Sequence, residues 1–165
     1  MARFAPAVEK ILNAEGGYQN DVEDLGNYNA YDASGNFVAY NQRKGQTLRA
    51  GTNRGISAGL YSSLRKREVS PEEMQAISRN KAIEIYRQVY WNKMKGDQIT
   101  NQRLAELILD SYVNHGSTGI KLLQKVLNRM GKTLEVDGRL GNRTLSALHQ
   151  VELESLYNGY IEARR

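Results

Sequence analysis

The segment that most constrains the fold is residues 19–55, which carry no helical periodicity and are rich in Asn, Gly, Asp, Tyr and Gln. Within it, residues 28–31 and 37–40 flank the turn-forming sequence 32–36, Asp-Ala-Ser-Gly-Asn. Two short aromatic segments around such a turn are typical of a β-hairpin. Because the rest of the chain has helical patterning, we predict an α+β fold, mainly α, with a small β-hairpin lobe and a helical lobe.

Apolar spacing and capping residues place the helices. Residues 3–15 form the first, and a short one is expected over 56–67. Ser70-Pro71-Glu72-Glu73 combines an N-cap, a proline at the first helical position and a capping box, and predicts a helix that runs to about Trp91. Further helices are expected from a Thr100 cap to about 116, over 118–130, and from Asn142 to the terminus.

Composition limits the class of protein. The chain has 165 residues, 40% of them hydrophobic, with a mean hydropathy of −0.62, which suits one compact globular domain or a domain with a small annex. No apolar run approaches the ~20 residues of a membrane span. After Met1-Ala2-Arg3 the sequence enters an amphipathic helix, so no signal peptide is expected. The absence of cysteine excludes disulfides, thiolate catalysis and cysteine-ligated metals.

A net charge of +5 and a pI of about 9.4 favour polyanionic partners such as nucleic acid, anionic lipid or bacterial cell wall. The basic residues are dispersed, however, and the densest run is 65–67, Arg-Lys-Arg. No nucleic-acid-binding motif is present, so no nucleic-acid partner is expected. His115 and His149 lack metal-ligand spacing, and we therefore expect neither a metal nor a cofactor.

One carboxylate stands out at the end of the first helix. The apolar stripe of Phe4, Val8 and Ile11 extends to Glu15, just before two glycines. A helix C-terminus and partial burial both disfavour an ionised carboxylate and should raise the pKa of Glu15, as a general acid requires. The alternative is an ordinary solvated residue in the last helical turn.

Asp21 and Thr52 follow on the expected β-lobe. A raised-pKa Glu together with an Asp or Thr could supply glycosidase roles, namely an acid for the leaving oxygen and a group that positions water or balances oxocarbenium charge. Asp21 could equally cap a turn. Thr52 or Asn53 could hold the nucleophilic water or only make hydrogen bonds within a turn.

Four ordered blocks across about 115 residues closely resemble the N-acetylmuramidases of glycoside hydrolase family 108. The first block combines residues 15–21, EGGYQND, and residues 52–57, TNRGIS. The other three are residues 85–91, IYRQVYW, residues 110–116, DSYVNHG, and residues 121–124, KLLQ. The resemblance implies a lysozyme-like fold that cleaves the β-1,4 bond between N-acetylmuramic acid and N-acetylglucosamine. Its proposed catalytic Glu corresponds to Glu15.

A further block, 122–127 followed by 136–148, resembles a peptidoglycan-binding module. Asp137-Gly138 is expected to form a turn, and Asn142 or Thr144 to cap the helix after Gly141. An ordinary helix-loop-helix of the core is the alternative. We expect a lysozyme-like catalytic region over 1–115 and a helical peptidoglycan-binding-like region over 116–165 that packs on it as one structural unit.

Three departures from the family pattern are visible. About 25 extra residues, roughly 27–51, follow the Asn-Asp pair; we expect them to enlarge the β-lobe and reshape the cleft. Val22 and Leu25 stand where many relatives have Pro. The chain ends at Arg165, where relatives usually continue for tens of residues, so a shortened C-terminus is expected.

Several polar and aromatic residues are candidates for substrate binding, each with a structural alternative. Tyr18 and Tyr90 could stack on sugar faces or pack into a wall of the core. Asn114 could bind an N-acetyl group or act as a helix C-cap, and Ser57 could contact substrate or serve as a helix N-cap. Trp91 is expected in the core and Asp110 in a structural hydrogen bond.

The leading interpretation is a monomeric peptidoglycan muramidase of the endolysin or prophage type, with Glu15 as acid and water directed by Asp21 or Thr52. A lytic transglycosylase that uses Glu15 alone and a non-catalytic wall-binding or DNA-binding protein are the alternatives. The protein is expected to be made in the cytoplasm and to reach the wall with the help of a holin or a secretion system.

Overall fold

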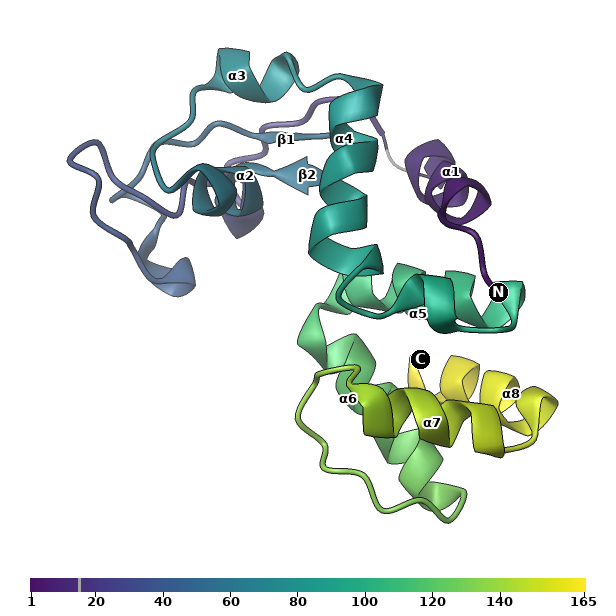
Figure 1. The fold of residues 1–165 in the computed structure, drawn as a ribbon. Coiled ribbons are helices and arrows are strands. Elements are labelled where there is room, and N and C mark those ends of the chain that lie inside the picture. Colours follow the sequence, from purple (N-terminus) through teal and green to yellow (C-terminus); the bar gives the residue numbers. More distant parts are fainter. Residues whose placement is uncertain (15) are drawn as a thin grey trace. The chain divides into compact units, whose positions relative to one another are not determined.

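The computed structural model describes residues 1–14 and 16–165 (Figure 1). Glu15, the expected general acid, lies outside the described residues. The chain divides into two compact units, one formed by 1–11 with 84–165 and the other by 12–83. We call them the helical unit and the β unit. Their mainly helical content and small antiparallel sheet confirm the predicted α+β class.

The sheet of the β unit consists of β1 (Thr52–Asn53) and β2 (Ile56–Ser57), with Thr52 opposite Ser57. Arg54 and Gly55 connect the two strands with φ angles of 53° and 77°. Positive φ at both turn residues is the geometry of a type I′ turn, which matches the twist of a hairpin. The regular two-stranded sheet is therefore this hairpin, which lies outside the predicted segment 28–40.

The predicted turn at 32–36 does form. The Asp32 carboxylate accepts hydrogen bonds from the backbone N–H of Ser34 and of Asn36, both at 2.9 Å. These bonds hold the pKa of Asp32 below its usual value, the one from Asn36 contributing most. A single antiparallel bridge, Tyr31 to Phe37, flanks the turn, and the chain then enters the 3-10 helix η2 (Tyr40–Gln42). Backbone hydrogen bonds from the Asp32 N–H to the Asn36 carbonyl, at 2.9 Å, and from the Val38 N–H to the Ala30 carbonyl, at 2.8 Å, pair the two short segments. The predicted hairpin pairing therefore forms, although neither segment is a regular strand.

The helix predicted from Ser70 to Trp91 is wrong as a single helix. Ser70 caps α3 (Pro71–Gln75) as expected, its Oγ accepting from the Glu73 N–H at 3.1 Å. The chain then breaks, and the Ser78 Oγ accepts from the Lys81 N–H at 3.0 Å at the start of the next helix. That helix is α4 (Arg79–Tyr86), which leads from the β unit into the π-helix η3 (Arg87–Trp91) of the helical unit.

The helical unit is built around α6 (Ser117–Arg129), which packs on α5 (Gln102–His115) and α8 (Leu153–Ala163). It also contains most of α1 (Phe4–Ala14), the 3-10 helix η4 (Gly96–Gln98) and α7 (Asn142–Gln150). Its fully buried side chains include Trp91, Leu104, Ile108, Leu109, Ile120, Leu123, Leu127, Leu156 and Tyr160.

Two expected boundaries in the helical unit are wrong. Asn101 rather than Thr100 caps α5, its Oδ1 accepting from the Leu104 N–H at 2.9 Å. The last helix is two helices: α7 ends at Gln150, and Glu152 caps α8 by accepting from the Ser155 N–H at 2.8 Å. Glutamate is a good helix former, so its presence gave no sign of a break at this point.

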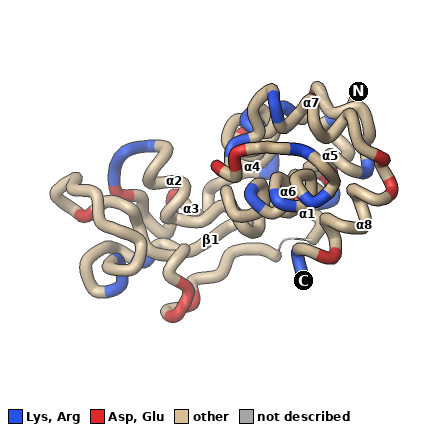
Figure 2. The backbone as a smooth tube through the Cα atoms, turned by 90° about the horizontal axis from the view of Figure 1, so that it is seen from below, with Lys and Arg blue, Asp and Glu red and all other residues tan. Residues whose placement is uncertain are grey.

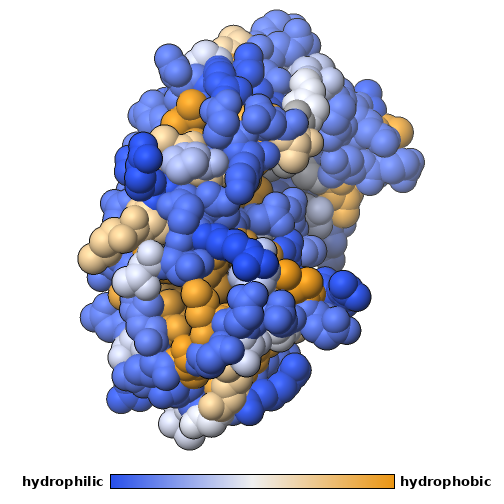
Figure 3. All heavy atoms as spheres, turned by 90° about the vertical axis from the view of Figure 1, so that its right-hand side faces the viewer, coloured by the Kyte–Doolittle hydropathy of each residue, from blue (hydrophilic) through white to orange (hydrophobic). Residues whose placement is uncertain are grey.

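The basic residues are dispersed along the chain (Figure 2), and the surface is mainly hydrophilic on the face that Figure 3 shows. In Figure 2 Lys and Arg occupy separate short segments of the tube rather than one continuous stripe, in keeping with the dispersed basic residues of the sequence. Figure 3 shows a face that is largely hydrophilic, with one apolar patch in its lower half bordered by polar side chains. Across 1–14 and 16–165, no helix has both the length and the apolar character that a membrane span needs.

Candidate active site

The side chain of Asn27 is the centre of a polar network in the β unit. It is fully buried at the end of the 3-10 helix η1 (Leu25–Asn27). Its Nδ2 donates to the Gln19 Oε1 at 2.8 Å and to the backbone carbonyl of Asp21 at 2.9 Å. Its Oδ1 accepts from the Thr52 Oγ1 at 2.6 Å and from the Gln19 Nε2 at 3.2 Å. Every donor of this buried amide is thus used, as burial requires.

Gln19 joins the segment that follows Glu15 to the first strand. Its backbone pairs with Thr52 in both directions, with N···O distances of 2.9 and 2.8 Å. Its side chain donates to the Asp24 Oδ2 at 2.9 Å and accepts from the Asp21 N–H at 2.9 Å. The network therefore holds residues 19–21 beside β1 and brings two expected catalytic residues, Asp21 and Thr52, into one hydrogen-bonded group.

The Thr52 hydroxyl has a defined polarity in this network. The Nδ2 of Asn27 has given both of its hydrogens to other acceptors, so the atom facing Thr52 is the amide oxygen and the hydroxyl must donate. The proton of Thr52 is therefore committed, while its lone pairs remain acceptors. A half-buried hydroxyl in this state can orient a water molecule but cannot take a proton from it.

Asp21 is exposed, and its carboxylate Oδ1 accepts from the Glu23 N–H at 2.9 Å. This is the turn-capping geometry that the sequence left open as an alternative. Among the described residues, no hydrogen bond reaches the second carboxylate oxygen, Oδ2. The backbone of Asp21 is fixed by Gln19 and Asn27, so the free oxygen is carried on a rigid support.

Tyr18 lies against Gly51, immediately before β1. Its hydroxyl donates to the Ala50 carbonyl at 2.8 Å, and a Cβ at Gly51 would come within 2.6 Å of the Tyr18 ring. Gly51 also has a φ of +96°, which favours glycine. The ring is half-buried, and it packs on Gly51, the residue that directly precedes Thr52.

Asn53 and Ser57 have structural partners. The Asn53 Nδ2 donates to the carbonyls of Met74 and Gln75, at 2.9 and 3.3 Å, where α3 ends. Ser57 caps α2 (Ala58–Arg65), its Oγ accepting from the Leu60 N–H at 3.1 Å. For both residues, these contacts favour the structural alternative kept beside substrate binding.

Tyr90 and Asn114 belong to the helical unit and are described there. Tyr90 lies between Tyr86 and Tyr112, with ring centroids 5.9 and 5.2 Å away. Burial, and then the neighbouring Tyr112, raise the pKa of Tyr90 above its usual value. The Asn114 Nδ2 donates to the Asp110 carbonyl at 2.9 Å, one helical turn back in α5. Trp91 is fully buried, as predicted.

Sequence reasoning missed the two amides that organise this site. Gln19 lies inside the motif around Glu15, and Asn27 is the first residue of the segment 27–51 that was predicted to be extra, yet neither received a role. The one available signal was that Gln19 lies between Tyr18 and Asp21 within this motif. Within the parts of the chain that the structure describes, no cluster of His, Cys, Asp or Glu could hold a metal ion.

Comparison with known proteins covers almost the whole chain. Residues 8–116 match the family model described as Glycosyl hydrolase 108, and residues 118–165 match one described as Predicted Peptidoglycan domain. Among solved structures, SagA of Brucella abortus is similar, with a TM-score of 0.73 and 29% sequence identity. The match covers 98% of this chain and 76% of the SagA chain. No curated protein matches the sequence significantly.

Proposed function

The chain belongs to glycosyl hydrolase family 108 and carries a peptidoglycan domain, and from this premise we propose that it is an N-acetylmuramidase with Glu15 as its general acid. Family membership makes it a glycoside hydrolase that acts on peptidoglycan. The proposal adds the bond, the β-1,4 link between N-acetylmuramic acid and N-acetylglucosamine, and the residues that act on it.

The observation that carries this proposal is the pairing of Gln19 with Thr52. It sets the segment after Glu15 beside a hydroxyl whose proton is committed to Asn27. In the proposed reaction, Glu15 protonates the glycosidic oxygen as its bond to the anomeric carbon breaks. A water molecule attacks that carbon, donating one hydrogen bond to the Thr52 Oγ1. Its second proton passes to the free Oδ2 of Asp21, so that one water is consumed and two free sugar ends result.

Replacing Glu15 by Gln tests the acid, because Gln keeps the shape and cannot donate the proton. We expect purified Glu15→Gln protein to clear cell-wall suspensions at least about 100-fold more slowly than wild type. Glu23→Gln is the matched control, since Glu23 is exposed and, among the described residues, its carboxylate pairs with Lys44 alone, at 3.1 Å. Clearing by Glu15→Gln at the wild-type rate would show that the acid is another residue.

Asp21→Asn tests the proposed base. The variant keeps an oxygen that can accept from the Glu23 N–H, so the turn is retained while the base is lost. We expect a loss of activity of about 100-fold or more with an unchanged melting temperature. Mass spectrometry of the released sugars separates the reactions: reducing ends support hydrolysis, whereas anhydro-muramic ends with full Asp21→Asn activity would indicate a transglycosylase that uses Glu15 alone.

A further inference from the structure

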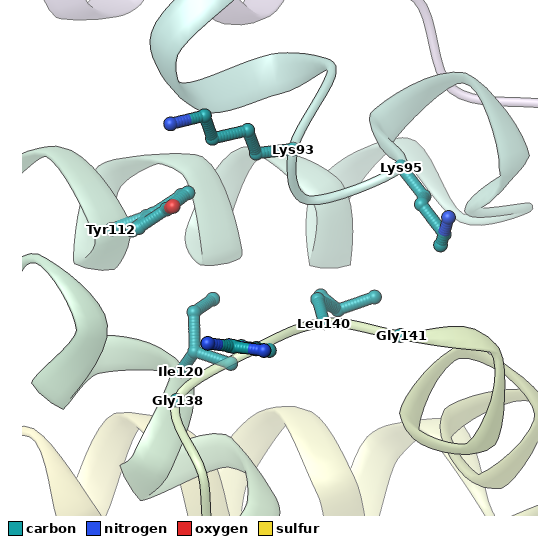
Figure 4. A pocket seen from close by; sticks show the side chains of 8 residues that line it. Lys93, Lys95, Tyr112, Ile120, Gly138, Leu140 and Gly141 are labelled. Carbon is teal, nitrogen blue, oxygen red and sulfur yellow. The ribbon is translucent and has the colours of Figure 1, made fainter.

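The helical unit contains a cavity of about 420 Å³ at the edge of the peptidoglycan domain (Figure 4). Lys93 and Lys95 reach it from the segment after η3, and Tyr112 from α5. The opposite wall comes from the start of α6 and the loop before α7, and includes Ile120, Arg139 and Leu140. The lining thus combines three cationic side chains with apolar and aromatic ones, and it contains no carboxylate.

None of the three cations of this pocket forms an ion pair with the described part of the protein, whereas Arg164 in the same unit pairs with Asp110. Arg139 has only the weaker coulombic attraction of the nearby Asp137 carboxylate. The acidic neighbour of the loop, Asp137, has its Oδ1 occupied by the Gln124 Nε2 at 3.0 Å and the Arg139 N–H at 2.9 Å. An anion entering the cavity would therefore meet positive charge without competition from a lining carboxylate.

The position of Lys95 is fixed by its neighbours. Lys95 has a φ of 55°, a left-handed conformation that costs a residue other than glycine about 1 kcal/mol or more. The next residue, Gly96, lies against the Trp91 indole, where an added Cβ would come within 2.3 Å of the ring. The indole N–H donates to the Asp97 Oδ1 at 2.8 Å. Contacts of Trp91 with Gly96 and Asp97 thus hold the loop around Lys95, whose side chain lines the cavity.

The apolar part of the lining is equally well supported. Ile120 and Leu140 are buried, and the half-buried Tyr112 packs edge-on against Tyr90 at 5.2 Å. No described residue hydrogen-bonds the Tyr112 hydroxyl, so it is available to a ligand. Positive charge above apolar and aromatic surface suits a ligand that carries carboxylates on small aliphatic groups.

We propose that this pocket binds the peptide stem of peptidoglycan through its free carboxylates. Lys93, Lys95 and Arg139 contact the carboxylates, and Ile120 and Leu140 contact the aliphatic side chains. The proposal rests on the proposed function, because it gives the same substrate a second contact away from the glycan bond. The proposal gives the peptidoglycan domain a binding site for the peptide stem, to which the segment 93–95 also contributes side chains.

The test measures binding apart from catalysis. Full-length Glu15→Gln protein is titrated calorimetrically at low salt with a soluble disaccharide-tetrapeptide, which this variant should leave intact. Adding Lys93→Gln and Lys95→Gln should raise the dissociation constant about fivefold or more, since each charge contact near the surface contributes a few tenths to 1 kcal/mol. The control adds Lys125→Gln and Arg129→Gln, which remove the same charge from exposed positions of α6 and should change affinity less than about twofold.

Three further probes identify the contact. The same ligand with its stem carboxylates amidated should bind the Glu15→Gln protein as weakly as the double lysine variant binds the acid form. Chitotetraose, which has no carboxylate, should bind both proteins equally. Equal effects of the pocket and control substitutions, or inorganic phosphate binding the pocket as tightly as the peptide, would overturn the proposal. Lysine-dependent peptide binding together with wall clearing by Glu15→Gln at the wild-type rate would count against the proposed function alone.

Discussion

The Thr52 hydroxyl donates a 2.6 Å hydrogen bond to the side-chain oxygen of Asn27, a residue 25 positions earlier in the chain. The Asn27 backbone carbonyl also accepts from the N–H groups of Ala50 and Gly51, at 2.8 and 3.1 Å. The backbone of segment 27–51 is thus closed at its two ends by Asn27. Because the same residue orients Thr52, this segment is built directly into the proposed site.

Replacing Thr52 by Val removes the hydroxyl while keeping the shape of the side chain. Asn27 Oδ1 is then left with its longer bond to Gln19, and we expect a loss of about 1 to 2 kcal/mol in the free energy of unfolding. Wall-clearing activity should fall further than stability explains, because the acceptor for the attacking water is gone. Thr52→Ser is the control and should retain both; urea unfolding and turbidity assays measure the two effects. Full activity in Thr52→Val would remove Thr52 from the mechanism.

Patterns local in sequence predicted much of this fold, and contacts distant in sequence decided the rest. The Ser70 cap and the turn at 32–36 depend on neighbouring residues, and both formed. The break after α3 did not follow from periodicity, because Met74, Ile77 and Ile85 are all buried across it. There the carbonyls freed at the helix end are met by the amide of Asn53, which lies far earlier in the chain.

The same distinction applies to the site. Asp21 and Thr52 could be selected because carboxylates and hydroxyls near a motif suggest chemistry. Asn27 could not, since it is one of several asparagines in a turn-rich segment and its partners lie on both sides of it. Strands of two residues are also too short to show alternation, so only the Arg54-Gly55 turn could have signalled the β1–β2 hairpin. Glu15 lies outside the described residues, and its role stays a prediction.

Gly51→Ala should destabilise the β unit through the Tyr18 contact. The added methyl group would come within 2.6 Å of the Tyr18 ring at a residue with a φ of +96°. Gly35→Ala is a matched control, because Gly35 has a φ of +84° and nothing within 4 Å. We expect about 1 kcal/mol of lost stability in the control and about 2 kcal/mol more in Gly51→Ala. Equal losses in urea unfolding would show that Tyr18 can move away at little cost.

Gln124 should be the most sensitive polar residue of the peptidoglycan domain. Its buried Nε2 contacts Asp137 Oδ1, the Arg139 carbonyl and Thr144 Oγ1 within 3.1 Å, and its Oε1 accepts from the Gly138 N–H at 3.0 Å. Gln124→Met keeps the volume and leaves these groups without partners, which should cost about 2 to 4 kcal/mol. Exposed Lys125→Met is the control. A Gln124→Met protein as stable as the control in thermal unfolding would contradict the assignment.

The pKa of Asp137 should respond to the same substitution. Hydrogen bonds hold it below its usual value in the folded protein, the one from Gln124 first and the one from the Arg139 N–H second. A lowered folded pKa contributes stability above the unfolded value, and this contribution is lost as the pH falls through the folded pKa. Gln124→Met should therefore raise the pKa of Asp137, which carboxyl NMR titration measures. An unchanged titration curve would show that the backbone bond alone sets it.

Tyr160 should make stability fall at alkaline pH. Its hydroxyl donates to the Gly119 carbonyl at 2.7 Å, and burial raises the pKa of Tyr160 to about 12. The unfolded phenol titrates near 10, so folding favours the protonated form and its full contribution is present below about pH 10. As the pH rises from about 10 to 12, the unfolded chain releases its proton first, and about 2 to 3 kcal/mol should be lost.

Tyr160→Phe separates this effect from lysine titration, which both proteins share. The variant lacks the bond to Gly119 and should be about 1 kcal/mol less stable than wild type near pH 8. Because Phe does not titrate, the difference should shrink above pH 10 and reverse before pH 12. Urea unfolding at several pH values measures both curves. Parallel curves across this range would mean that the Tyr160 phenol is not held in its neutral form by the fold.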